Sequence, residues 1–99
     1  MSVIVNFAIF PTDKGISVSP YVARVTEYIR SKGYKSQLTA MSTIVETNTL
    51  DEALELLSKA YNILESDCER VYLSANFDIK KGPIGRIDSK VESVEQKLL

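Results

Sequence analysis

The sequence predicts an α+β sandwich, in which four antiparallel strands form one sheet and two helices cover one of its faces. Apolar residues recur with the period of a strand in four segments and with the period of a helix in two longer ones. These segments follow the order βαββαβ, in which each helix joins two strands that must lie parallel. The 99 residues suffice for one core, so we expect a single domain over residues 1–99.

Prolines mark the first strand and the first helix. The segment "SVIVNFAIF" (2–10) is a continuous run of β-prone residues that a proline closes. Ser19 before Pro20 predicts an N-cap followed by the first helical residue. Helical spacing then continues to Gly33, which predicts a helix over about 20–32. Its apolar stripe consists of Val22, Val25 and Ile29.

Two short strands and a long helix come next. The segments "YKSQLTAM" (34–41) and "STIVETN" (42–48) predict the arms of a hairpin. Thr49 and Glu52 then form a capping-box pattern at the start of the second helix. The broad apolar stripe of this helix consists of Leu50, Ala53, Leu54, Leu57, Ala60, Tyr61 and Leu64.

The last third of the chain predicts one strand and one more helix. The segment "RVYLSANFDI" (70–79) alternates with period two, so it predicts the fourth strand. The tail over 87–99 has apolar residues at helical spacing and a second capping-box pattern in Ser89 and Glu92. We therefore expect a short extra helix at the C-terminus.

Together these elements predict a ferredoxin-like fold with the strand order 4-1-3-2, in which the helices leave one face of the sheet open. The alternation of the first strand turns Asn6 toward that open face, and Ser74 and Asn76 of the fourth strand should lie beside it. Glu46 joins them if the third strand presents its even-numbered residues. The opposite parity, with Thr43 on the open face, is equally compatible with the pattern.

The expected open face is rich in uncharged polar groups, whereas a solvated sheet face more often carries Lys, Glu and Arg. Amides and hydroxyls suit a surface that another subunit or a ligand covers. Two interpretations of Glu46 remain. It is an exposed carboxylate at a strand end, or it lies in a partly apolar pocket and accepts hydrogen bonds from a heterocycle. The residues of this face are Asn6, Glu46, Ser74 and Asn76, flanked by Phe10 and Tyr72.

Composition disfavours several classes of partner. Twelve basic and thirteen acidic residues give a net charge of −1, so no overall field steers the protein to nucleic acid or to anionic lipid. No apolar stretch approaches the roughly 18 residues that span a membrane, and the N-terminus lacks a basic signal-peptide region. We expect a cytoplasmic protein with neither a nucleic-acid nor a membrane partner.

The absence of histidine limits the chemistry. Together with a single cysteine, Cys68, it argues against a zinc site, an internal disulfide and the catalytic triads that depend on imidazole. We therefore expect no catalytic residue, no metal and no cofactor. An acylphosphatase-like hydrolase fits poorly, because the loop after the first strand has one lysine and no arginine. A nucleic-acid-binding sandwich fits poorly because the third strand lacks the aromatic pair that stacks bases.

Several motifs resemble the small thiamine-binding family, which is related to YkoF-type domains. The resemblance covers nearly the whole chain and is carried by "VSPYVARV", "QLTAMSTIVE", "RVYLSANFDI" and "DSKVESVE". Its most specific part is the spacing of Thr39, Met41, Thr43 and Glu46. It implies a ferredoxin-like protein that forms homodimers and tetramers and binds thiamine or its hydroxymethylpyrimidine moiety without catalysis.

The resemblance also suggests roles for individual residues. It implies that Glu46 faces the N1′ and 4′-amino groups of the aminopyrimidine, and that Thr43 and Thr39 add polar contacts. Asn6 and Asn76 are further candidates from their expected place on the open face, and Phe10 or Tyr72 could stack on a ring. The alternative function is a regulatory or interaction module that self-associates and has no small-molecule ligand.

Overall fold

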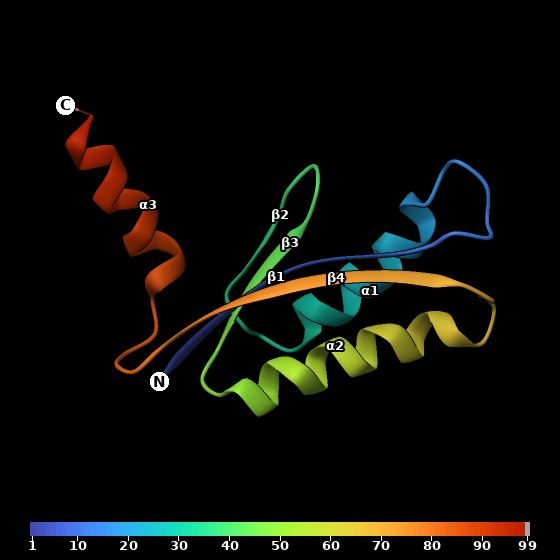
Figure 1. Ribbon diagram of the computed structural model, residues 1–99, viewed down its shortest axis with the longest axis horizontal. Helices are drawn as coiled ribbons and strands as arrows, with labels where there is room; N and C mark the ends of the chain where they lie inside the picture. The colour runs from blue at the N-terminus through green and yellow to red at the C-terminus, as the bar shows by residue number, and fades with distance from the viewer. Residues whose placement is uncertain (99) are drawn as a thin grey trace.

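The computed structural model describes residues 1–98, so Leu99 of the expected domain lies outside the described residues. Its four strands form one antiparallel sheet in the order β2-β3-β1-β4, which confirms the expected strand order. Helices α1 and α2 lie together on one side of this sheet (Figure 1). The elements are β1 (Ser2–Pro11), α1 (Ser19–Ser31), β2 (Ser36–Leu38), β3 (Thr43–Thr47), α2 (Leu50–Glu65), β4 (Val71–Lys80) and α3 (Arg86–Lys97).

Of the three helix N-caps predicted from local sequence signals, the structure confirms one. At α2, the Thr49 side chain accepts a hydrogen bond from the Glu52 amide and the Glu52 side chain returns one, which confirms the capping box. The Ser19 prediction was wrong by one position, because Ser19 is already helical and Val18 occupies the N-cap without a side-chain bond. The second capping-box prediction was also wrong, because α3 begins at Arg86, before Ser89.

The register of the sheet decides the parity of β3. Val3 lies opposite Thr47 and Phe7 lies opposite Thr43. Directly opposite residues of antiparallel strands share a face. The odd-numbered residues of β3 therefore face the helices, and Glu46 faces the open side. The core below the sheet consists of Val3, Val5, Phe7, Ile9, Val25, Ile29, Val45, Ala53, Leu56, Leu57, Ala60, Leu64 and Cys68.

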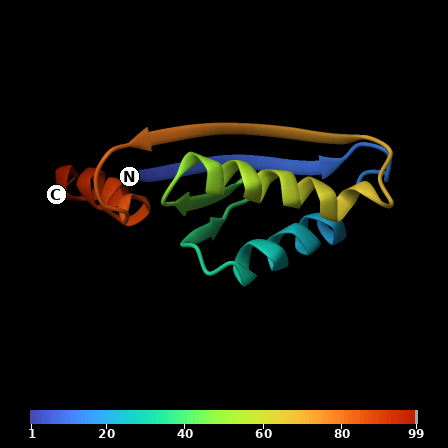
Figure 2. The same cartoon turned by 90° about the horizontal axis from the view of Figure 1, so that it is seen from below.

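The fourth strand has the expected alternation but not the expected burial. Its odd-numbered residues lie opposite Val3, Val5, Phe7 and Ile9 and therefore turn toward the helices. Several of them are still exposed, because β4 is an edge strand and no helix covers its outer side. Figure 2 shows β4 along the margin of the sheet, with α2 between it and α1.

The third helix stands apart from the sandwich. It lies beyond the end of the sheet near the N-terminus, away from α1 and α2 (Figure 1). Ile87 is its one buried residue among those described, whereas Val91 and Val94 are more than half exposed. Along residues 1–98, no helix is both long enough and apolar enough to cross a membrane.

Candidate functional site

The structure separates the predicted site residues into two groups. Phe10, Thr39 and Thr43 line one cavity at the far end of β1. Glu46 lies on the open face of the sheet, opposite Ile4 and three residues along β3 from Thr43. Three residues of a strand span about 10 Å. Thr43 and Glu46 thus belong to opposite faces of the sheet and to different surroundings.

The two asparagines lie together on the open face. Asn6 and Asn76 are opposite each other in the pairing of β1 with β4, which confirms the expected neighbourhood. Asn6 is partly buried and Asn76 is exposed. Phe10 and Tyr72 lie opposite each other further along the same two strands and form an aromatic pair. Their ring centroids are 5.4 Å apart and the interplanar angle is 34°. Phe10 belongs both to this pair and to the cavity wall.

The cavity has a volume of about 350 Å³ and lies between the end of β1, helix α1 and the turn that joins β2 to β3. Small-molecule sites in proteins typically begin at about this size. No charged side chain lines it. The lining residues are Phe7, Ala8, Ile9, Phe10, Val18, Val22, Val25, Thr26, Leu38, Thr39, Ala40, Met41, Ser42 and Thr43.

The cavity exists because β1 is longer than β3. The pairing of β1 with β3 ends at Phe7 and Thr43, whereas the pairing with β4 continues to Pro11. The main chain of β1 therefore has an unpaired edge beyond Phe7, beside the β2–β3 turn. Ile9 and Phe10 line the cavity from this edge.

The hydrogen-bond pattern shows which way the free main-chain groups point. The Glu46 amide donates to the Lys35 carbonyl over 3.0 Å, so even-numbered residues of β3 bond toward β2 and odd-numbered ones toward β1. On β1, the amide of Thr12 bonds on the β4 side, to the Arg70 carbonyl at 2.8 Å. Odd-numbered residues of β1 consequently bond toward β3. The N–H and C=O of Ile9 thus point to the unpaired edge.

Thr39 shapes the turn at the cavity mouth. Its hydroxyl donates to the Ser42 carbonyl over 2.8 Å and accepts from the amides of Met41 and Ser42. The Thr39 amide also donates to the Ser42 carbonyl. Because these bonds occupy the hydroxyl, its first role is to hold the turn. The exposed Met41 side chain, 88% accessible, extends from the same turn.

Thr43 offers the cavity a polar group in an otherwise apolar wall. Its side chain turns toward the helices and is 9% exposed. Within residues 1–98, no buried side-chain oxygen or nitrogen lacks a hydrogen-bond partner. The Thr43 hydroxyl forms no hydrogen bond with the described protein groups, so its oxygen keeps some accessible surface, and Thr43 lines the cavity. It is therefore available to a bound molecule.

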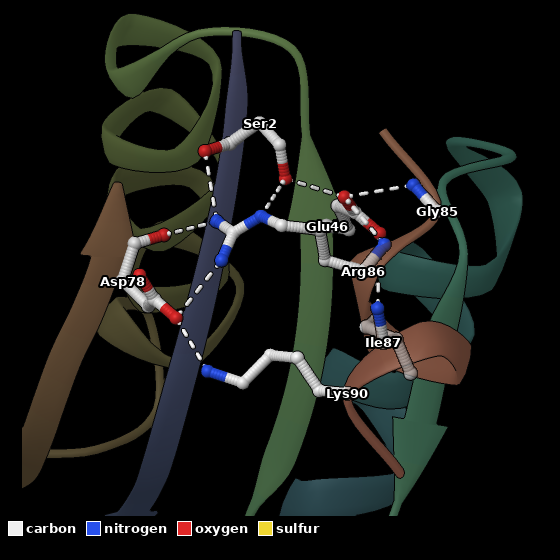
Figure 3. Close-up of polar contacts among 7 residues, drawn as sticks. All are labelled: Ser2, Glu46, Asp78, Gly85, Arg86, Ile87 and Lys90. Carbon is white, nitrogen blue, oxygen red and sulfur yellow. Dashed lines mark hydrogen bonds and ion pairs between the residues drawn. The ribbon is translucent and has the colours of Figure 1, made fainter. Parts of the chain in front are cut away.

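Glu46 is engaged by the protein itself. The residue is 5% exposed, so the interpretation as an exposed strand-end acid was wrong. Its Oε2 atom accepts from Ser2 Oγ at 2.5 Å and from the amides of Gly85 and Arg86 at 3.0 and 3.2 Å. Its Oε1 atom accepts from the Ile87 amide at 3.4 Å. Glu46 thus caps the N-terminus of α3 (Figure 3).

Arg86 completes this cluster on the side of β4. Its guanidinium donates to Ser2 Oγ, to the Ser2 carbonyl and to the carbonyl and carboxylate of Asp78, at 2.9–3.0 Å. Lys90 of α3 forms an ion pair with the same Asp78 carboxylate. The open end of the sheet therefore holds α3 through one polar network that joins three strands (Figure 3).

The two acids of the network ionise more easily than usual. Burial acts to raise the pKa of Glu46, but the hydrogen bonds from Ser2 and from the α3 amides outweigh it, so the pKa is lowered. The hydrogen bonds from Lys90 and then Arg86 lower the pKa of Asp78. Both groups are charged at neutral pH. Nowhere in residues 1–98 do three acidic, cysteine or histidine side chains gather as a candidate metal site.

Sequence reasoning missed the partners of Glu46 and the role of Ile9. Ser2, Gly85 and Arg86 lie 39 to 44 residues from Glu46 along the chain, so no local pattern joins them. The sequence offered one signal for this helix start, the glycine before Arg86. Gly85 is the N-cap and has a positive φ of 108°, a conformation that glycine adopts more readily than other residues. Every residue type has the same main-chain N–H and C=O groups as Ile9 except proline, so the sequence could not indicate that these groups point to the unpaired edge of β1.

The chain resembles known proteins over most of its length. The family model described as thiamine-binding protein matches residues 5–95. The UPF0045 protein MJ1052 of Methanocaldococcus jannaschii is 32% identical over 92 residues, which cover 93% of this chain and 91% of that protein. The UPF0045 protein CPE1503 of Clostridium perfringens is 33% identical over 88 residues, or 88% of this chain and 90% of that protein.

Solved structures share the fold. The crystal structure of MJ1052 superposes with a TM-score of 0.85 at 31% identity, covering 95% of this chain and 96% of that one. A crystal structure from Thermotoga maritima, of a protein suggested to act in thiamine biosynthesis or salvage, gives a TM-score of 0.81 at 26% identity and covers 95% and 99% of the two chains. The chain belongs to the thiamine-binding protein family.

Proposed function

We propose that the protein is a non-catalytic binder of thiamine or a related aminopyrimidine such as hydroxymethylpyrimidine. It acts as a single ferredoxin-like domain over residues 1–99 that assembles into homo-oligomers in the cytoplasm. The observation that carries the proposal is the uncharged cavity at the unpaired edge of β1. Membership of the thiamine-binding family supplies the class of ligand.

The cavity suits a flat heterocycle with a polar edge. The N–H and C=O of Ile9 present one donor and one acceptor side by side, as a strand presents them to its neighbour. A ring nitrogen next to an exocyclic amino group, as in an aminopyrimidine, complements that pair. Thr43 would add a hydroxyl contact, and Phe10 and Val22 would contact the faces of the ring. An aromatic contact of this kind contributes about 0.5–1.5 kcal/mol.

Glu46 can serve the same ligand only across a subunit boundary. In its own chain it lies on the face opposite Thr43, and its oxygens accept four hydrogen bonds. A second subunit that brings its cavity against the open face would place a ring near Glu46, Asn6 and Asn76. In that arrangement Glu46 would exchange an α3 amide for an N–H group of the ring.

Calorimetric titration with thiamine, thiamine phosphate and hydroxymethylpyrimidine tests the proposal. We expect saturable binding of hydroxymethylpyrimidine, and weaker binding of an analogue that lacks the exocyclic amino group. Thr43→Val keeps the shape of the side chain and removes the hydroxyl, so it should weaken binding about tenfold, or about 1.4 kcal/mol. Thr12→Val is the control, because Thr12 is exposed and lies outside the cavity.

The absence of heat with all three compounds would refute the cavity as a ligand site. Unchanged affinity in Thr43→Val together with a loss in Glu46→Gln would move the site to the open face. Since Glu46→Gln also affects α3, its titration must be accompanied by a check that the helix is still docked.

A self-associating module without a ligand is the second candidate. The observation in its favour is the exposure of apolar residues at both ends of the sheet: Tyr72 at the far end of β4 is 55% exposed, and Val91 and Val94 of α3 are 56% and 60% exposed. This function predicts a defined oligomer in light scattering and no saturable titration. The same measurements therefore separate the two candidates.

A further inference from the structure

The Met41 side chain is exposed although it belongs to the lining of an apolar cavity. It is 88% exposed, and among the large apolar residues of the described chain only Ile16 is more exposed. Single exposed apolar residues are common on protein surfaces and need no explanation. Met41 differs from them because it lies at the mouth of the uncharged cavity of about 350 Å³. It thus leaves its apolar surface in water beside a cavity that it could cover.

The main chain of the β2–β3 turn holds Met41 in place. The Met41 amide donates to the Thr39 hydroxyl at 3.3 Å, and the same hydroxyl donates to the Ser42 carbonyl at 2.8 Å. The segment 38–43 contains no glycine, so none of its residues changes its main-chain conformation easily. We therefore expect a change at the cavity mouth to come from side-chain rotation and not from movement of the turn.

A methionine side chain is suited to such a rotation. It is unbranched and has three rotatable bonds, so it can reach several positions from one fixed main-chain site. Its thioether sulfur is polarizable and makes favourable contacts with aromatic rings at a distance of about 5 Å. The group carries no charge, like the rest of the cavity lining. The chemistry of Met41 thus matches a flat aromatic ligand.

The mouth is the side of the cavity where a cover would have most effect. In the proposed function, the main-chain groups of Ile9 bind the polar edge of the ring, and Phe10 and Val22 contact its faces. Water has access from the mouth at the β2–β3 turn. An apolar cover there would keep water from the Ile9 hydrogen bonds, and these bonds become stronger as the local dielectric constant falls.

We propose that the Met41 side chain folds over the cavity mouth when an aromatic ring is bound, so that Met41 is a ligand-contacting residue of the site. The inference rests on the proposed function and adds a closing step to it. Ordering the side chain costs rotamer freedom, whereas its burial and the contact of sulfur with the ring are favourable, and the surplus should amount to roughly fivefold in affinity. Because the closed side chain delays the escape of the ligand, most of this gain lies in the dissociation rate.

Oxidation by dilute hydrogen peroxide measures the exposure of Met41 directly. The peroxide transfers one oxygen atom to the thioether sulfur, which is oxidised to the sulfoxide while the peroxide is reduced to water. Without ligand, the sulfur should react as fast as in a short peptide, because the side chain is 88% exposed. Saturating hydroxymethylpyrimidine should slow the reaction by a factor of at least about five, since oxidation follows exposure. Peptide mass spectrometry gives the rate.

Val94→Met supplies the matched control. Val94 is 60% exposed and belongs to α3, which lies near the N-terminus, whereas the cavity lies at the far end of β1 (Figure 1). The methionine introduced there should be oxidised at the same rate with and without ligand. A slower reaction at that position as well would indicate that the ligand only consumes the peroxide, and protection of Met41 would then not count as closure.

Three substitutions of Met41 separate the effect of a cover from that of polarity. Met41→Ala removes the cover, and Met41→Gln keeps an unbranched side chain but makes it polar. Both should weaken the binding of hydroxymethylpyrimidine roughly fivefold, mainly through faster dissociation. Met41→Leu keeps an apolar side chain of similar volume and should stay within about twofold of the unaltered protein. Denaturant titration should show equal stability for all three variants, because an exposed side chain contributes little to folding.

Peroxide treatment before the titration gives a second readout. Methionine sulfoxide is polar, so the treated protein should lose affinity as Met41→Gln does. Treated Met41→Leu should keep its affinity. Since both proteins contain Cys68, oxidation of that residue cannot explain a difference between them.

Failure of the closing step is distinguishable from failure of ligand binding. Saturable titration together with equal oxidation of Met41 in the presence and absence of ligand would overturn the closing step alone. Slow oxidation of Met41 already in the free protein, or unchanged affinity in Met41→Ala, would overturn it as well. The absence of heat with every compound refutes the proposed function, and the inference that rests on it is then refuted too.

Discussion

Glu46→Gln should undock α3 and destabilise the protein. The replacement keeps the size of the side chain and removes its charge, which faces the N-terminus of α3 through the amides of Gly85, Arg86 and Ile87. A partly buried charge in such a position contributes up to about 2 kcal/mol. The new amide group would also meet the Ile87 amide, and an unsatisfied buried donor costs about 1–3 kcal/mol.

We expect a total loss of about 2–3 kcal/mol in the free energy of unfolding, because the Ile87 bond is long and the two costs overlap. For a chain of this size the melting temperature should fall by at least about 8 °C. Denaturant titration measures the free energy, and hydrogen exchange at residues 85–87 reports the docking of α3.

The matched control is Glu55→Gln. Glu55 is an exposed residue of α2 that pairs with Lys59 at 3.6 Å, and such a pair contributes less than about 0.5 kcal/mol. The reasoning is refuted if Glu46→Gln and Glu55→Gln have equal stability and equal exchange at residues 85–87. In that case the bonds from Glu46 to α3 would not hold the helix.

Three further predictions concern pH, the ligand and α2. The folded-state pKa of Glu46 is lowered, so its stabilisation is complete above the unfolded-state pKa of about 4.3 and is lost as the pH falls through the lower folded-state pKa. An acid titration should therefore release α3 only at a pH below the unfolded-state value, and Glu46→Gln should lack this step. Thiamine phosphate should bind more weakly than hydroxymethylpyrimidine, because no cation lines the cavity to pair with the phosphate; equal affinities by calorimetry would contradict this. Thr49→Ala removes the acceptor of the capping box and should cost about 1 kcal/mol in denaturant titration, with no effect on ligand affinity.

The sequence by itself determined the elements and most of their faces, because these depend on neighbours close along the chain. The alternation around Asn6 placed it beside Asn76, and Thr49 with Glu52 marked the start of α2. Where the local signals were ambiguous the predictions failed. The pattern of Ser89 and Glu92 resembles a cap, yet α3 starts earlier because Glu46 supplies its cap from β3.

Only the tertiary structure decided what the candidate site residues do. Thr43 and Glu46 stand three positions apart in one motif, but the register of β3 against β1 sends them to opposite faces. The cavity that Thr43 lines forms because β1 extends past β3. This depends on how the two strands are aligned, which neither sequence segment shows by itself. The burial of Glu46 likewise depends on Ser2 and Arg86, which only folding brings to it. Periodicity identifies the face of a residue, whereas register and strand length decide its neighbours, and the neighbours set its chemistry.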